Sequence, residues 1–160
     1  MIKHIKKFRS KLLELLTHRL ALPIITKFRK TPPFPYTMED LLKFPDHTLG
    51  KDLALYLQER KYHLLRNYER HDCKHIILQF EMDEVGEARM QFYFLGNRRY
   101  SIPVITTVLL VFILMPEHWS KFLYEFKKGR KAPSFKHADF SKLVLMNTLD
   151  LRKKFTQSNI

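Results

Sequence analysis

Glycine is scarce in this chain of 160 residues. The four glycines, Gly50, Gly86, Gly96 and Gly129, are spaced so that no two lie closer than ten residues. P-loops and dinucleotide-binding loops need closely spaced glycines, because backbone amides must approach a phosphate group. The sequence therefore excludes both kinds of loop. Because helix interiors disfavour glycine, its scarcity also favours a helical chain.

Length and composition predict one compact domain. A chain of 160 residues with 45% hydrophobic and 13% aromatic residues can bury a single core. We predict an all-α fold, a compact single-domain helical bundle with a basic amphipathic N-terminal helix. The lone cysteine, Cys73, excludes an internal disulfide and any multi-cysteine zinc or iron–sulfur site.

The N-terminal residues predict a basic amphipathic arm. Apolar residues recur at helical spacing from Ile2 to Leu20, with lysines and arginines between them. Residues 1–36 contain nine Lys and Arg residues and a single acidic residue, Glu14. The net charge of the whole chain is +13. Such a helix lies on an anionic membrane or packs on the protein body, and amphipathicity does not separate the two. The predicted organisation is an arm over 1–30, a Pro-rich linker over 31–36 and a helical metal-binding domain over 37–160.

Helix-start and helix-stop signals divide the rest of the chain. Thr37 and Asp40 resemble a capping box, and Thr48 can cap the next helix. A turn near Gly86 separates a helix with two histidines from one that begins at Glu87. The last two predicted helices cover 117–128 and 139–155.

The most apolar stretch runs from Ile102 to Met115. It is too short to span a bilayer, which takes about 20 residues. We expect a buried helix with Ser101 as its cap and Pro103 in its first turn. Its β-branched content leaves a buried strand as the alternative.

His71, Asp72 and His75 form the pattern HDxxH. Residues four apart share one face of a helix, so the two imidazoles can meet one metal ion. The nearest source of a third ligand is the acidic turn that ends at Glu87. With Asp72 as a fourth ligand or as a base, the set suits zinc or another divalent metal with an open position. The alternative is a pair of core histidines bonded to these carboxylates or to backbone oxygens.

The same residues resemble a known family. His71-Asp72-x-x-His75, followed after eleven intervening residues by Glu87, matches the HDxxHx(11)E signature of the Coq-four family of ubiquinone (coenzyme Q) biosynthesis proteins. Five shorter matches lie in the family's order: Phe44 to Lys51, Tyr68 to Arg70, Gly86-Glu87, Ile102-Pro103 and Gly129 to Pro133. The resemblance covers residues 44 to about 135 and is far more specific than HDxxH alone.

The resemblance implies an all-helical fold and a zinc ion held by His71, Asp72, His75 and Glu87, with Asp72 or Glu87 exchanging a proton. It implies a homodimer attached peripherally to a membrane, on the cytoplasmic face in a bacterium or on the matrix side of the mitochondrial inner membrane in a eukaryote. It also implies a role on a polyprenylated aromatic ring. In the family this role is associated with a metal-dependent lyase that removes the C1 carboxylate, with hydroxylation of that carbon, and with organising other quinone-biosynthesis proteins.

An isoprenoid tail requires an apolar tunnel. The candidates to line it are Phe92, Phe94, Val108 and Phe112. Ordinary core packing is the alternative for each of them.

Two other functions fit parts of the sequence. A nucleic-acid or anionic-lipid scaffold without catalysis would use Lys3 to Lys11 and Lys127 to Lys131, but no zinc finger or RNA-recognition signature accompanies these residues. A zinc hydrolase would use Asp72 in place of the glutamate of HExxH, although a shorter carboxylate lies farther from a zinc-bound water.

Overall fold

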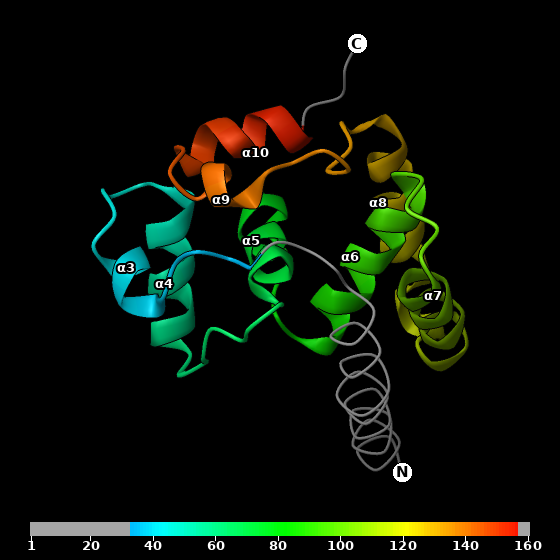
Figure 1. Cartoon of the computed structure of the whole chain (residues 1–160). Coiled ribbons are helices and arrows are strands. Elements are labelled where there is room, and N and C mark those ends of the chain that lie inside the picture. Colours follow the sequence, from blue (N-terminus) through cyan, green and yellow to red (C-terminus); the bar gives the residue numbers. More distant parts are fainter. Residues whose placement is uncertain (1–32, 157–160) are drawn as a thin grey trace.

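The computed structural model describes residues 33–156, whose regular elements are all helical (Figure 1). In chain order they are α3 (Met38–Leu42), α4 (Leu49–Glu59), α5 (Glu69–Leu78), α6 (Glu84–Gly96), α7 (Ile102–Leu114), the 3-10 turn η2 (Pro116–His118), α8 (Trp119–Lys131), α9 (Phe140–Leu143) and α10 (Thr148–Thr156). The predicted all-α class is confirmed. The predicted N-terminal helix and the first residues of the linker lie outside the described residues.

The two predicted N-terminal caps are present. The Thr37 hydroxyl accepts a hydrogen bond from the Asp40 amide at 3.2 Å, and the Asp40 carboxylate accepts one from the Thr37 amide at 2.9 Å. The Thr48 hydroxyl accepts from the Lys51 amide at 3.3 Å, at the start of α4. The local sequence was sufficient to predict both caps, because each capping side chain accepts a hydrogen bond from an amide in the first turn of its own helix.

α5 is the central helix of the structure, with α4, α6 and α10 around it (Figure 1). Every residue of α5 from Asp72 to Leu78 is buried. The core around it is built from large apolar side chains of four helices: Leu53, Leu57, Ile77, Met90, Tyr93 and Leu151. This packing fixes the position of α5 and therefore of the HDxxH residues that it carries.

The single helix predicted over 139–155 is instead broken into α9 and α10. The backbone amides of Leu49 and Gly50, at the start of α4, donate to the carbonyl oxygens of Met146 and Val144, both at 2.9 Å. Asn147 directly precedes α10, and its side chain accepts a hydrogen bond from the Leu149 amide at 2.9 Å. The break thus provides hydrogen-bond acceptors for the first amides of α4, which is distant in sequence. Hydrophobic periodicity within residues 139–155 cannot predict such a contact.

α6 and α8 pack closely because each presents a glycine to the other. A Cβ on Gly96 would lie 2.0 Å from the Phe126 carbonyl oxygen, and one on Gly129 would lie 2.0 Å from the Tyr93 carbonyl oxygen. These two glycines therefore permit a contact between the backbones.

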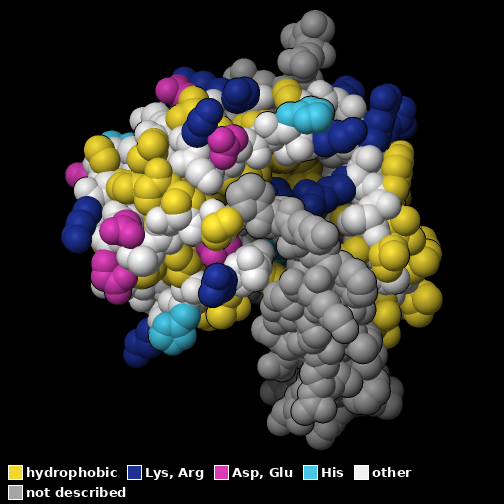
Figure 2. Space-filling view, in the orientation of Figure 1, with side chains coloured by type: hydrophobic (Ala, Val, Ile, Leu, Met, Phe, Trp, Pro, Cys, Tyr) yellow, Lys and Arg dark blue, Asp and Glu magenta, His cyan; other side chains and the backbone are white. Residues whose placement is uncertain are grey.

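The apolar helix α7 begins after Ser101 as predicted, but it is not buried. Val104, Val108 and Val111 face inward, whereas Ile102 is 78% and Ile113 is 75% exposed. The expectation of a buried helix was wrong because one face of α7 has no covering element among residues 33–156. Apolar side chains gather where α7 lies (Figure 2), and the exposed ones of α7 and α8 are Ile102, Ile105, Leu109, Phe112, Ile113, Trp119, Leu123 and Tyr124.

Within residues 33–156, no single helix is both long and apolar enough to cross a membrane. α7 and the segment Pro116–Lys131 meet that criterion only when taken together, and they are bent by 102° at the break between them.

Candidate metal site

Two histidines of α5 converge on one glutamate of α6. The Nε2 atom of His75 lies 3.1 Å from Oε2 of Glu87, and Nε2 of His71 lies 3.2 Å from the same oxygen. The candidate ligand atoms of the three residues all lie within 4.8 Å of one another. Zinc ligands at tetrahedral angles lie about 3.4 Å apart, so these contacts have the right scale for a shared ion.

The turn between α5 and α6 returns the chain so that Glu87 reaches the histidines. α5 ends at Leu78, and the residue that caps it, Gln79, has a φ of 59°, which reverses the backbone. The Asp83 side chain then caps α6 by accepting from the Gly86 amide at 2.6 Å. A Cβ on Gly86 would lie 2.0 Å from the Glu81 carbonyl oxygen, so the turn packs directly on the first turn of α6.

The sequence prediction placed the start of this helix at Glu87, and the structure places it at Glu84. Gly86 therefore lies inside the helix rather than in the preceding turn. A glycine is required at position 86 because the Glu81 carbonyl oxygen lies against it, a contact that the spacing of apolar residues does not predict.

His75 is held by its other ring nitrogen. Its Nδ1 lies 3.0 Å from the backbone carbonyl oxygen of Phe80, which can only accept a hydrogen bond. Nδ1 therefore carries the proton, and a neutral His75 directs the lone pair of Nε2 toward Glu87. A histidine whose distal nitrogen donates to a backbone carbonyl is the usual arrangement of a metal ligand.

His71 has the matching arrangement with a carboxylate. Its Nδ1 lies 3.4 Å from Oδ1 of Asp72, while its Nε2 faces Glu87. The structure thus brings together three of the four predicted ligands, and it places Asp72 behind the ring of His71 rather than in the converging group. This position orients His71, and it disfavours the hydrolase alternative, in which Asp72 would face the metal-bound water.

Glu87 has a further partner that the sequence analysis missed. Gln91, one turn later on α6 and buried, donates its Nε2 to Oε1 of Glu87. The i to i+4 spacing was the available signal, since such residues share a helix face. Gln91 therefore fixes the direction of the carboxylate.

The titration of the site follows from its charges. Burial by itself lowers the pKa of His71, but the charge of Glu87 and hydrogen bonds with Asp72 and Glu87 outweigh it and raise that pKa to about 9. Burial raises the pKa of Glu87, but the charge of His71 and the hydrogen bond from His71 outweigh burial and hold that pKa well below its usual range. Glu87 is thus a carboxylate balanced by positive charge, which a divalent metal would supply in place of the His71 proton.

The site is partly open. The His75 side chain is 2% exposed, whereas the side chains of His71 and Glu87 are 25% and 28% exposed. Two imidazoles and one carboxylate fit zinc or another divalent transition metal. The exposed side leaves room for a further ligand from solvent or substrate.

Three of the four predicted lipid-tail residues are buried, and the fourth is exposed. Phe92 is buried and stacks on Phe122, with ring centroids 4.7 Å apart. Phe94 and Val108 are buried, whereas Phe112 lies on the outer face of α7 and is 42% exposed. Core packing accounts for the position of Phe92. A tunnel for an isoprenoid tail would have to pass all four side chains, of which only Phe112 is exposed.

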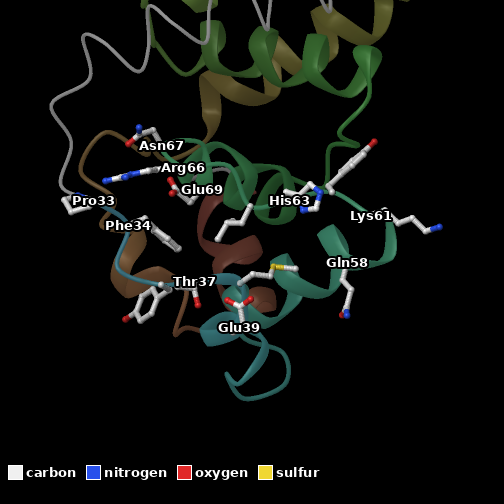
Figure 3. A pocket seen from close by; sticks show the side chains of 14 residues that line it. Pro33, Phe34, Thr37, Glu39, Gln58, Lys61, His63, Arg66, Asn67 and Glu69 are labelled. Atoms are coloured by element: carbon white, nitrogen blue, oxygen red, sulfur yellow. The ribbon is translucent and has the colours of Figure 1, made fainter.

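A separate hollow of about 1190 Å³ lies between α3, α4 and the segment that precedes α5 (Figure 3). Its walls mix apolar, acidic and basic side chains, among them Phe34, Glu39, Lys61 and Arg66. None of the predicted metal-ligating or lipid-tail residues lines it.

Comparison with known proteins finds a similar fold among solved structures. No protein-family model and no curated protein matches the chain. The crystal structure of a candidate ubiquinone biosynthesis protein from Nostoc punctiforme PCC 73102 matches with a TM-score of 0.62 and 19% sequence identity, covering 92% of this chain and 81% of that one. The two proteins share a fold. The shared fold agrees with the all-helical fold that the motif resemblance implied.

Proposed function

We propose that the chain is a metal-binding protein of ubiquinone biosynthesis that acts on a polyprenylated aromatic ring at a membrane surface. The observation that carries the proposal is the convergence of Nε2 of His71 and Nε2 of His75 on Glu87. The HDxxHx(11)E pattern and the fold shared with the Nostoc protein support the pathway.

Zinc is the metal that we propose, held by His71, His75 and Glu87. The donor set supports it, because nitrogen and carboxylate ligands with an open position are typical of catalytic zinc. Asp72 and Gln91 hold His71 and Glu87 in orientation from outside this set. A fourth position remains for a substrate oxygen or a solvent molecule.

The reaction that we propose is removal of the C1 carboxylate of the ring. A metal ion at the site would supply a Lewis acid that orients the carboxylate and stabilises negative charge. The bond between the ring carbon and the carboxyl carbon breaks, carbon dioxide leaves, and a proton takes its place on the ring. Asp72, which lies outside the metal-binding set, or Glu87 is the carboxylate that we propose to exchange this proton.

The exposed face of α7 and α8 supports attachment to a membrane. It presents apolar side chains together with Trp119 and Tyr124, a composition typical of the boundary between water and lipid. Exposed cations of α8, Lys121 and Lys127, lie on the same helix and would attract anionic lipid. We propose the cytoplasmic face of a bacterial membrane, or the matrix side of the mitochondrial inner membrane in a eukaryote. The resemblance supports a homodimer that assembles with other quinone-biosynthesis proteins.

The proposed reaction can be tested with a polyprenyl hydroxybenzoate that carries an isotopic label in its carboxylate, presented in phospholipid vesicles. The zinc-loaded chain is expected to release labelled carbon dioxide, and the Glu87→Gln variant is expected to release none. Glu84→Gln is the matched control, because Glu84 lies on the first turn of α6 outside the metal-binding group. Equal release by the Glu87 variant, or no release by the zinc-loaded chain, would refute the reaction.

A further inference from the structure

A second cavity, of about 470 Å³, lies at the far end of α6 from Glu87. Five cationic side chains line it, and no acidic side chain is among the described residues of its wall. On the face drawn in Figure 2, Lys and Arg side chains gather beside apolar ones in a hollow near the middle of the molecule. The cations are Arg70, Lys74, Arg98, Arg99 and Lys136.

These cations come from three separate segments. Arg70 and Lys74 lie one turn apart on α5, each directly before a histidine of the metal group. Arg98 and Arg99 follow α6, and Lys136 lies in the segment between α8 and α9. Attraction to the carbonyl end of α6 can account for the two arginines that follow it, but not for the cations of the other two segments.

The cavity has a fixed frame. Asn97 donates through Nδ2 to the carbonyl oxygens of Gly129 and Ala132, at 3.0 and 2.8 Å, and so ties the end of α6 to the end of α8. Arg98, which lines the cavity, adopts a φ of 60°, a left-handed conformation that is unfavourable for arginine and turns the backbone there. The position of the cations is therefore built into the fold.

Aromatic rings form the apolar part of the wall. Lys74 is only 4% exposed, and its Nζ lies 5.3 Å from the ring centre of Phe94 and 5.4 Å from that of Phe140. The guanidinium carbon of Arg99 lies 5.4 Å from the Phe94 ring centre. A ligand in this cavity would meet both clustered positive charge and an apolar surface.

We propose that this cavity binds a phosphate group, either of a soluble organic phosphate or of a phospholipid headgroup. Guanidinium groups present paired donors that match phosphate oxygens, and the clustered cations would compensate a dianion. The volume suits a headgroup-sized ligand. The proposal is independent of the proposed function, because none of these residues belongs to the metal group.

The test measures binding of inorganic diphosphate to the full chain by isothermal titration calorimetry, with a chelator present so that no metal bridges the anion to His71. Arg98→Gln/Arg99→Gln is expected to weaken binding about tenfold or more, since it removes two charge-assisted contacts. Lys136→Gln is a second variant at an exposed position of the wall. The matched control Lys127→Gln/Lys153→Gln removes the same charge from exposed positions outside the cavity and is expected to bind normally.

A second arm uses phosphatidylcholine vesicles with and without phosphatidic acid. Diphosphate binding that depends on the cavity arginines supports a soluble phosphate, and arginine-dependent binding only to vesicles with phosphatidic acid supports a lipid headgroup. Equal weakening in the control would show diffuse charge attraction and overturn the proposal. The proposal would also be overturned if both cavity variants bound as tightly as the wild-type chain, or if the wild-type chain bound neither diphosphate nor the vesicles.

Discussion

The Nδ1 atom of His75 lies 3.0 Å from the backbone carbonyl oxygen of Phe80, and this contact determines what the opposite nitrogen offers to Glu87. With the ring proton on Nδ1, a neutral His75 and an ionised Glu87 would face each other as two acceptors 3.1 Å apart. Such an approach is repulsive unless a proton or a cation lies between the atoms. A shared metal ion resolves it for His75 and takes the place of the proton that His71 directs to Glu87.

The position of Asp72 predicts a limited effect on metal binding. Because Asp72 contacts the distal nitrogen of His71, Asp72→Ala is expected to weaken zinc affinity about 10- to 100-fold without abolishing it. His71→Ala is expected to abolish it. Competition with a chelator measures both, with Asp46→Ala, an exposed loop carboxylate, as the control. A loss in Asp72→Ala as complete as in His71→Ala would instead make Asp72 a direct ligand.

The pKa of His71 predicts opposite pH dependences for metal binding and for stability of the metal-free chain. A metal binds the neutral imidazole, so zinc affinity is expected to rise with pH until about pH 9, the pKa of His71. In the metal-free chain this pKa lies above the value of about 6.5 of an unfolded histidine. The His71 contribution to the free energy of unfolding is therefore complete below that pH and lost as the pH rises toward 9.

Thermal unfolding of the metal-free chain between pH 6.5 and 9, beside His71→Gln, checks the second part. The variant lacks the titrating imidazole, so it is expected to lose less stability over this range than the wild-type chain. Parallel pH curves for the two proteins would contradict the assignment.

Gly86 is expected to be essential for the turn that positions Glu87. Its added Cβ in Gly86→Ala would meet the Glu81 carbonyl oxygen at 2.0 Å, and a backbone atom cannot rotate away. We expect a loss of about 1 to 3 kcal/mol in the free energy of unfolding by urea, typical of overpacking. Gly50→Ala is the control, because its nearest contact is the Phe44 ring at 2.7 Å, a side chain that can shift. Equal stability of the two variants would be inconsistent with this role.

The helices that these residues occupy could be predicted from the sequence where the signal is local. The caps at Thr37 and Thr48 and the HDxxH spacing on α5 depend on residues within one or two turns of each other. The break before α10 depends on contacts with α4, which is distant in sequence. The role of Gly86 and the Phe80 contact each span only five residues, but they depend on the backbone geometry of the turn between α5 and α6, which residue spacing does not specify. The exposure of α7 could not be predicted either, because an apolar helix has the same composition whether a core or another surface covers it.

That exposed face gives a prediction for membrane binding. Leu109→Ser/Ile113→Ser is expected to weaken binding to anionic vesicles by about tenfold for each side chain that enters the apolar layer. Stability is expected to change little, because both side chains are exposed in the described part of the chain. Vesicle sedimentation measures the binding, with Leu55→Ser/Leu149→Ser as an equally apolar control on α4 and α10. Equal losses in the two double variants would rule out a specific role of α7.

The central claim, a metal held by His71, His75 and Glu87, is tested most directly by the metal content of the purified, tag-free chain. Inductively coupled plasma mass spectrometry is expected to find about one zinc or other divalent ion per chain, as a single three-residue site requires. His71→Ala, His75→Ala and Glu87→Ala are each expected to lose it while helical circular dichroism persists. A wild-type chain that carries no divalent ion, and retains none after zinc loading and dialysis, would contradict the account.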